Sequence, residues 1–313
     1  MNDALIELRA WRQFVAVAEE LHFGRAAQRL HMTQPPVTQA IAQLEKTLGV
    51  VLFDRTRRRV ALTPAGEALL PDVRELLARA QALPARARAA AAGQVGRVRI
   101  AFVSTVGFEQ LPAWVREFRV LCPEVALELV EATGDVQLEA FARDEIDAGL
   151  MLHSPGAAPP GLACLPVEVE PLVLALPAQH RLAGAWPVPL ADVLDEPLVI
   201  FPRRIVPSLH DAIFGLYHAA GRTPQVAQEA IQMQTIVNLV SGGIGAAWVP
   251  HSVMQFRRAG VVYRQVHEFK GVGRRRVTLP VCETSLVWPA QASHPALARF
   301  VAFVRERAGH VPA

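Results

Sequence analysis

The chain has 313 residues, of which 51% are apolar, and it carries a formal net charge of +3. This length exceeds one ordinary compact unit, so we expect two or three packed domains, and the apolar content excludes a disordered chain. The mild charge does not by itself indicate a nucleic-acid partner, so the placement of the charged residues has to decide.

The N-terminal sequence lacks the basic start and apolar core of an export signal, because Asp3 and Glu7 precede any apolar run. No apolar stretch approaches the roughly 20 residues that span a bilayer. Cys122, Cys164 and Cys282 lie far apart without metal-ligand spacing, which favours reduced thiols over the alternative of a redox-sensing pair. We therefore expect a soluble, cytoplasmic protein without a membrane partner, a metal site or a cofactor.

The first part of the chain predicts three short helices in succession. Apolar residues recur at three- and four-residue steps over residues 5–18, which predicts an amphipathic helix. A second helix is expected over residues 24–30. Thr33 is a suitable N-cap for a third helix, which has two prolines in its first turn and ends at Gly49.

The third helix has an unusual polar face. Its apolar residues follow steps of four, three and four over residues 37–48, and the opposite face presents Gln34, Thr38, Gln39 and Gln43. Amides and hydroxyls can both donate to and accept from base edges in the major groove of DNA. Taken alone, the face fits a merely solvated helix equally well.

An arginine-rich hairpin follows this helix. Short strands are expected over residues 50–53 and 60–62, and four of the five positions 55–59 between them are arginine. Such a charge run is usually a solvated loop. Directly after an amide-faced helix, however, it has the position of a wing that reaches phosphates or the minor groove. Together the two features strongly favour DNA and predict a winged helix-turn-helix over residues 1–62.

A longer helix is expected over residues 63–93. Its apolar stripe, over residues 69–83, exceeds what a lone surface helix needs, which indicates a linker that pairs with a second subunit. Pro71 and Pro84 interrupt this pattern. We expect Pro84 to kink the helix or to end its first segment.

Beyond residue 97, short apolar runs alternate with helical patterns, which predicts an α/β fold with mainly parallel sheets. The expected strands cover residues 98–103, 125–130, 146–152, 172–176, 198–201, 245–249 and 261–265. The expected helices cover residues 108–121, 136–143, 208–220, 233–241 and 295–307.

Several sequence motifs carry a family resemblance. They are FGRAAQRLHMTQPPVT at residues 23–38, LE at 44–45, LG at 48–49, LFDRT at 52–56, LTPAG at 62–66, IDAG at 146–149 and GIGAAWVP at 243–250. With these motifs the chain closely resembles LysR-type transcriptional regulators over essentially its whole length, and the N-terminal block is the most specific part.

The resemblance implies a winged helix-turn-helix, a dimerising linker helix over residues 63–93, and an effector domain over residues 94–313. The effector domain is expected to resemble type II periplasmic binding proteins, with two lobes between which the chain crosses twice. Lobe I would comprise about 97–167 and 268–313, and lobe II about 168–267. The implied partners are operator DNA at promoters, a small-molecule effector, RNA polymerase and further copies of the chain, assembled as a dimer of dimers.

By position in the family motif, Gln34, Pro35, Thr38 and Gln39 match the part of the recognition helix that contacts bases and phosphates, and Arg55 matches the wing arginine. Many relatives carry arginine where this chain has Gln39 and Gln43. Because glutamine suits adenine and arginine suits guanine, we expect a different operator preference. The candidate DNA contacts are Thr33, Gln34, Pro35, Thr38, Gln39, Gln43, Arg55, Arg57 and Arg58.

In this fold a ligand binds between the lobes, at strand ends that meet helix N-termini. The candidate effector contacts are Ser104, Thr105, Thr133, Phe201, Pro202, Arg203, Arg204 and, more weakly, Gln234. Each serine or threonine alone is better explained as a helix cap, so the arrangement of the segments carries the hypothesis. We expect a small carboxylate, to which Arg203 or Arg204 adds a bidentate contact unless both point to solvent. The segment 201–204 also resembles the subgroup that responds to muconate or benzoate.

Two other classes of protein compete with a regulator. A transporter's solute-binding protein shares the two-lobed fold, but it needs an export signal and has no use for residues 1–62. An enzyme on the same fold needs catalytic residues, and the sequence has no nucleophile elbow, metal-binding histidine pair or phosphate-cradling glycine loop. The glycines at residues 242–245 have the wrong spacing for a dinucleotide fingerprint. We therefore expect no enzymatic activity.

Overall fold

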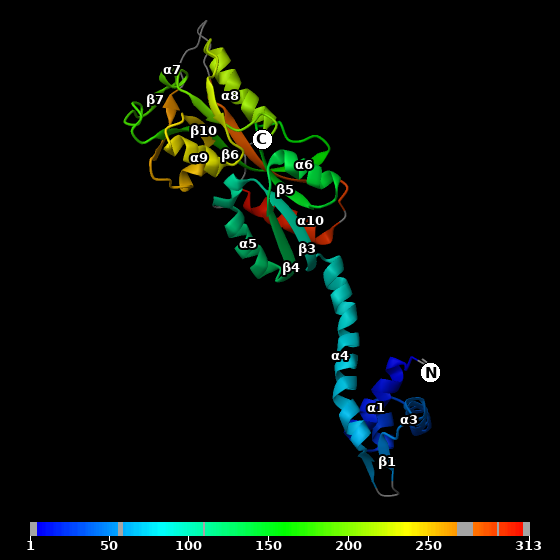
Figure 1. Ribbon diagram of the computed structural model, residues 1–313. Helices are drawn as coiled ribbons and strands as arrows, with labels where there is room; N and C mark the ends of the chain where they lie inside the picture. The colour runs from blue at the N-terminus through cyan, green and yellow to red at the C-terminus, as the bar shows by residue number, and fades with distance from the viewer. Residues whose placement is uncertain (1–4, 56–58, 109, 268–277, 293, 309–313) are drawn as a thin grey trace. The chain divides into compact units, whose positions relative to one another are not determined.

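The computed structural model describes residues 5–55, 59–108, 110–267, 278–292 and 294–308. The chain divides into two compact units, Met1–Arg88 and Ala89–Ala313 (Figure 1). A search of the described helices finds none that is long and apolar enough to cross a membrane.

The first unit is a small helical domain with a two-stranded hairpin. Its elements are α1 (Leu8–Glu20), α2 (Phe23–Arg29), α3 (Gln34–Leu48), β1 (Phe53–Arg55), β2 (Val60–Leu62) and α4 (Pro64–Ala91). The core is aromatic at its centre, because the ring of Phe53 lies 5.6 Å from that of Phe14 and 6.0 Å from that of Phe23. The three helices and the hairpin agree with the predicted winged helix-turn-helix.

The first strand of the hairpin begins later than predicted. We expected a strand over residues 50–53, but β1 starts at Phe53 and the side chains of Val50 and Val51 are exposed. The Glu45 carboxylate accepts hydrogen bonds from the backbone N–H groups of Leu52 and Phe53, so these groups are already satisfied before the strand begins.

Helix α4 runs without interruption through both Pro71 and Pro84. The expectation that the helix could end at Pro84 is therefore wrong. A proline inside a helix removes one backbone donor. Pro84 stands among alanine, leucine and arginine, the residues with the highest helix propensity, which favour continuation on both sides.

The second unit has two lobes, each with its own core. The first lobe contains β3 (Val95–Phe102), η1 (Ser104–Phe108), α5 (Gln110–Leu121), β4 (Glu124–Glu131), α6 (Gly134–Ala142), β5 (Ala148–His153) and α10 (Pro295–Arg307). Helices α5 and α10 pack through aromatic rings, since Phe118 lies 5.2 Å from both Phe300 and Phe303.

The second lobe lies between these segments in the sequence. It contains β7 (Val188–Pro189), α7 (Leu190–Val193), β8 (Leu198–Ile200), α8 (Pro207–Ala219), β9 (Val226–Glu229), α9 (Met233–Ser241), β10 (Ala247–Pro250), η2 (His251–Gln255), β11 (Val261–Arg264) and β12 (Val266–His267). The buried residues of this lobe form a cluster separate from that of the first lobe.

Two long strands, β6 (Leu162–Pro177) and β13 (Val281–Pro289), connect the lobes in a seven-stranded sheet of order β10-β6-β13-β5-β3-β4, with β11 also paired to β6. The first part of β6 pairs with β13, and its last part pairs with β10 and β11. The predicted predominance of parallel pairing is wrong for this sheet, because β3 is parallel to β4 and β5 but the other described pairings within it are antiparallel. The reason is that β6 leads into the second lobe and β13 returns from it, so they run in opposite directions. The two small sheets of the second lobe, β7 with β12 and β8 with β9, are parallel as predicted.

Candidate functional site

Helix α3 presents the polar face that the sequence predicts. Val37 and Ile41 are fully buried, and the helical repeat of 3.6 residues directs the residues opposite them outward. The exposed candidate contacts are Thr33, Gln34, Pro35, Gln39 and Gln43. Thr33 occupies the N-cap position, although its side chain makes no capping hydrogen bond, and Gly49 ends the helix with a φ of 72°.

Two candidate contacts have more particular surroundings. Thr38 is half-buried, and its hydroxyl donates to the backbone carbonyl of Gln34 at 3.1 Å. Gln43 lines a groove of about 520 Å³ together with Gln13 of α1 and Met32. Gln43 therefore lies at the α1 edge of the face, whereas Gln39 lies nearer its centre.

The wing arginine is held against the recognition helix. The Nη2 of Arg55 donates to Oε2 of Glu45 at 2.7 Å, and its guanidinium lies 4.9 Å from the centre of the Phe23 ring. Oε1 of the same carboxylate accepts from the backbone N–H groups of Leu52 and Phe53 at 2.9 and 3.1 Å. Glu45 thus fixes β1 and Arg55 relative to α3. Sequence reasoning missed this role, although Glu45 belongs to one of the family motifs. Arg57 and Arg58 lie outside the described residues.

The second candidate site is a cleft between the two lobes. Its first-lobe wall comprises Val103, Ser104, Thr105, Ala132, Thr133 and Leu152, and its second-lobe wall comprises Phe201, Ile205, Val206, Ile231, Gln232 and Met233. The free volume is about 40 Å³, which admits water but is far below the roughly 300–1,000 Å³ of a typical ligand pocket. A ligand can enter only if the lobes or the lining side chains move.

The hydroxyl groups of this cleft lie on the first-lobe wall, and the second-lobe wall adds the amide of Gln232. Ser104 and Thr105 are buried, and the Thr105 hydroxyl is a buried group for which the described residues provide no hydrogen-bond partner. Thr133 is the N-cap of α6, and its hydroxyl donates to the Asp135 carboxylate. No charged side chain is among the described residues that line the cleft. Thr105 is therefore the group best placed to bind a ligand atom there.

The other four candidate effector residues do not line this cleft. Arg203 donates from Nε and Nη2 to both carboxylate oxygens of Asp211, at 2.7 and 2.6 Å, and this lowers the pKa of Asp211. Arg204 lies 3.8 Å from the Asp135 carboxylate. Both arginine side chains are exposed, and each forms its ion pair with a carboxylate at the surface. Pro202 is buried outside the lining, and Gln234 lines a separate groove of about 740 Å³.

A further groove between the lobes is acidic. It has a volume of about 520 Å³, and Thr105, Glu168, Glu170, the ion pair of Glu117 with Arg307, and His251 are among its described lining residues, so carboxylates outnumber the one guanidinium there. Oε1 of Glu170 accepts from the Ser252 hydroxyl at 2.9 Å, and burial raises the pKa of Glu170. Carboxylates here would repel an anionic ligand. No sequence motif predicted this groove, because its residues are widely separated in the chain.

Comparison with known proteins matches both units. Residues 8–67 match the family described as bacterial regulatory helix-turn-helix protein, lysR family, and residues 91–309 match the LysR substrate binding domain. The chain is 43% identical over 302 residues to the HTH-type transcriptional regulator IlvR of Caulobacter vibrioides, covering 96% of this chain and 98% of that one. It is 39% identical over 265 residues to the HTH-type transcriptional regulator AlsR of Bacillus subtilis, covering 85% and 87% of the two chains.

A solved structure extends the match to the fold. Full-length CbnR in complex with its target DNA has a TM-score of 0.78 and 32% sequence identity, and the match covers 96% of this chain and 99% of that one. The match therefore spans both units described above. The chain belongs to the LysR family of DNA-binding transcription regulators, with an N-terminal helix-turn-helix domain and a C-terminal effector-binding domain.

Proposed function

We propose that this regulator responds to a small carboxylate that binds between the lobes at Thr105. The observation that carries the proposal is the buried Thr105 hydroxyl, which lacks a partner in a cleft without charged lining residues. An unsatisfied buried polar group costs about 1–3 kcal/mol, and a ligand that bonds to it removes this cost.

The chemistry of the two walls favours an acid with an apolar body. The hydroxyls of Ser104 and Thr105 can donate to a carboxylate, and Phe201 and Met233 on the opposite wall suit an apolar chain or ring. A cationic ligand would instead be attracted to the acidic groove that Glu168 and Glu170 line. The apolar wall also supports the proposed kinship to the subgroup that responds to aromatic-catabolism intermediates, because an aromatic acid combines both features.

Binding must change how far the lobes close, because the observed cleft has only about 40 Å³ of free space. An effector that prefers one degree of closure shifts the population toward that state. If the assembled regulator prefers different DNA geometries in the two states, the effector changes the affinity for DNA by linkage.

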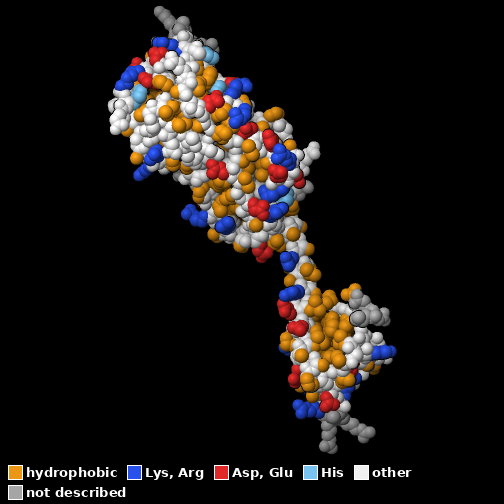
Figure 2. Space-filling model, in the orientation of Figure 1, with side chains coloured by type: hydrophobic (Ala, Val, Ile, Leu, Met, Phe, Trp, Pro, Cys, Tyr) orange, Lys and Arg blue, Asp and Glu red, His pale blue; other side chains and the backbone are white. Residues whose placement is uncertain are grey.

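On the DNA side, we propose that the exposed face of α3 contacts bases and that Arg55 reaches the phosphates beside it. Helix α4 is proposed to pair subunits, since 44% of Leu76 and 60% of Leu83 are exposed to water and a second subunit would cover them. Figure 2 shows hydrophobic side chains at the surface of this helix. We further propose that the chains assemble as a tetramer, a dimer of dimers, which contacts RNA polymerase at the promoter. We also propose that the protein is located in the cytoplasm with the DNA and that it catalyses no reaction.

Calorimetry of the full chain against a panel of aromatic and aliphatic carboxylic acids tests the effector proposal. The substitution Thr105→Val keeps the shape of the side chain and removes the hydroxyl. It is expected to lower the affinity for the tightest-binding acid by about 10- to 100-fold, because this is what the loss of one hydrogen bond to a charged group costs.

The matched control is Arg203→Ala, because Arg203 is paired with Asp211 outside the cleft. This variant is expected to bind the acid as the wild type does. Binding by no acid in the panel, or unchanged binding by Thr105→Val, contradicts the proposal.

A further inference from the structure

The sheet that joins the lobes brings together three side chains that are widely separated in the sequence. His153 ends β5, Cys164 lies on β6 and Glu283 lies on β13, and β13 pairs with both of the other strands. His153 and Glu283 stand directly opposite each other in the register. One ligand atom from each of the three residues lies within 4.8 Å of the others.

The imidazole of His153 is oriented so that a ring nitrogen can act as a ligand atom between the three side chains. Its Nδ1 lies 2.8 Å from the backbone carbonyl oxygen of Ser154. A carbonyl oxygen only accepts, so Nδ1 carries the proton and Nε2 of the neutral ring has the lone pair. Nε2 is buried, and no hydrogen-bond partner for it exists among the described residues.

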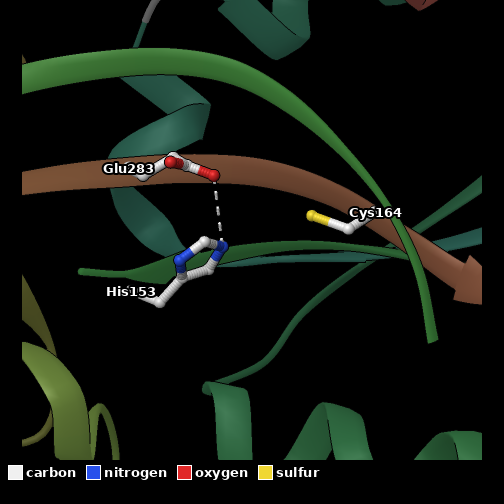
Figure 3. Close-up of side chains that lie close together, drawn as sticks. All are labelled: His153, Cys164 and Glu283. Carbon is white, nitrogen blue, oxygen red and sulfur yellow. Dashed lines mark ion pairs between the residues drawn. The ribbon is translucent and has the colours of Figure 1, made fainter. Parts of the chain in front are cut away.

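The carboxylate of Glu283 faces this nitrogen at ion-pair distance but makes no hydrogen bond to it. Its Oε1 lies 3.8 Å from Nε2, beyond hydrogen-bond distance (Figure 3). The side chains of His153 and Glu283 are only 5% and 11% exposed. Two buried acceptors that face each other require a shared cation or an added proton, because water does not screen them.

The third side chain decides which cation fits. Figure 3 shows the Cys164 sulfur pointing into the space between the imidazole and the carboxylate. A set of nitrogen, sulfur and oxygen ligands suits zinc and similar transition metals and disfavours magnesium and calcium, which take oxygen ligands. Around tetrahedral zinc such atoms lie about 3.3–3.6 Å apart, so the site needs a closure of about 1 Å.

Hydrogen bonds from neighbouring groups orient His153 and Glu283, as is usual for the ligands of metal sites. The Ser154 carbonyl holds the His153 ring, and the Ser285 hydroxyl donates to Oε1 of Glu283 at 2.9 Å. We propose that His153, Cys164 and Glu283 form a binding site for a divalent transition metal such as zinc, with a fourth position open to water.

The protonation state of the Cys164 thiol determines whether metal binding releases a proton. Although the residue as a whole is exposed, partial burial of its thiol raises the pKa of Cys164; Ser285 opposes this and the Glu283 carboxylate adds to it. The thiol of the metal-free protein is therefore protonated at neutral pH, and one proton passes to solvent when the thiolate binds the metal.

The test uses the full chain, without a histidine tag and stripped with a chelator. Calorimetry with zinc is expected to give one ion per chain. Cobalt(II) is expected to give a thiolate charge-transfer band, and zinc is expected to protect Cys164 from a thiol reagent. Cys164 is the exposed cysteine, whereas Cys122 and Cys282 are buried.

The decisive variant is Cys164→Ser, which changes an exposed residue and should fold normally. It is expected to weaken zinc binding at least about tenfold and to abolish the charge-transfer band. The control Cys122→Ser changes a thiol of the same lobe that accepts from Arg299 instead, and it should retain both properties. Absence of zinc binding, or binding that Cys164→Ser leaves unchanged, overturns the proposal and leaves an imidazolium–carboxylate pair.

Discussion

Gln39 lies near the centre of the exposed face of α3, with a free amide that both donates and accepts. Its neighbours differ in how much freedom they have. The Thr38 hydroxyl is bonded to the backbone, and Gln43 lies at the edge beside α1. We therefore propose that base recognition through this helix depends on Gln39 more than on the other predicted contacts.

The substitution Gln39→Ala is expected to cost about 1–3 kcal/mol in binding to the specific operator, because a bidentate amide contact to a base is lost. Binding to unrelated DNA should stay the same, since phosphate contacts dominate it. Footprinting and fluorescence anisotropy measure both quantities. An unchanged operator affinity would exclude direct base contact by Gln39.

Individual site residues could be predicted from the sequence only where their local position determines their role. Ser104 and Thr105 follow a strand, and both line the cleft between the lobes. Arg203 could not be placed in this way, because its bonds to Asp211 depend on how α8 packs. The proposed metal ligands could not be found from the sequence either, since only the sheet brings His153 near Cys164 and Glu283.

At the scale of the elements, one carboxylate connects the recognition helix to the wing. Glu45 accepts from two backbone N–H groups and from Arg55, and its side chain is only 14% exposed. An ordinary surface pair on α4, between Glu75 and Arg79, gives a useful contrast because Glu75 is 62% exposed.

The substitution Glu45→Gln is expected to lower the free energy of unfolding of the first unit by about 1–3 kcal/mol, since the amide nitrogen cannot accept from the donors that the carboxylate holds. Glu75→Gln should cost at most about 0.5 kcal/mol. Chemical denaturation followed by the fluorescence of Trp11 in α1 measures this. Equal costs for the two variants would show that Glu45 acts only as a surface charge.

Elements with a regular apolar period were the most predictable. Helices α9 and α10 have the predicted bounds because their buried residues repeat at helical steps. Strand β13 was missed because Glu283, Thr284 and Ser285 interrupt its apolar pattern, yet all three are buried within the sheet. Polar groups of this kind can be buried in a strand when neighbouring groups satisfy them, as Ser285 does for Glu283.

At the scale of the whole molecule, the proposed mechanism requires that the cleft of the two-lobed domain has two states with different DNA affinities. The family resemblance predicted the fold and the crossing between lobes, and the strands β6 and β13 make this crossing. The closed cleft of about 40 Å³ is a property of side-chain packing that no sequence pattern shows. An effector that binds at Thr105, as proposed, must therefore alter the packing of this cleft.

The affinity for promoter DNA, measured by anisotropy with and without the tightest-binding acid, tests this coupling most directly. For the wild type we predict a change in Kd of at least about fivefold at a saturating acid concentration. Thr105→Val should need about 10 to 100 times more acid to reach the same change in DNA affinity. An equal response of both proteins to the acid would contradict an effector site at Thr105.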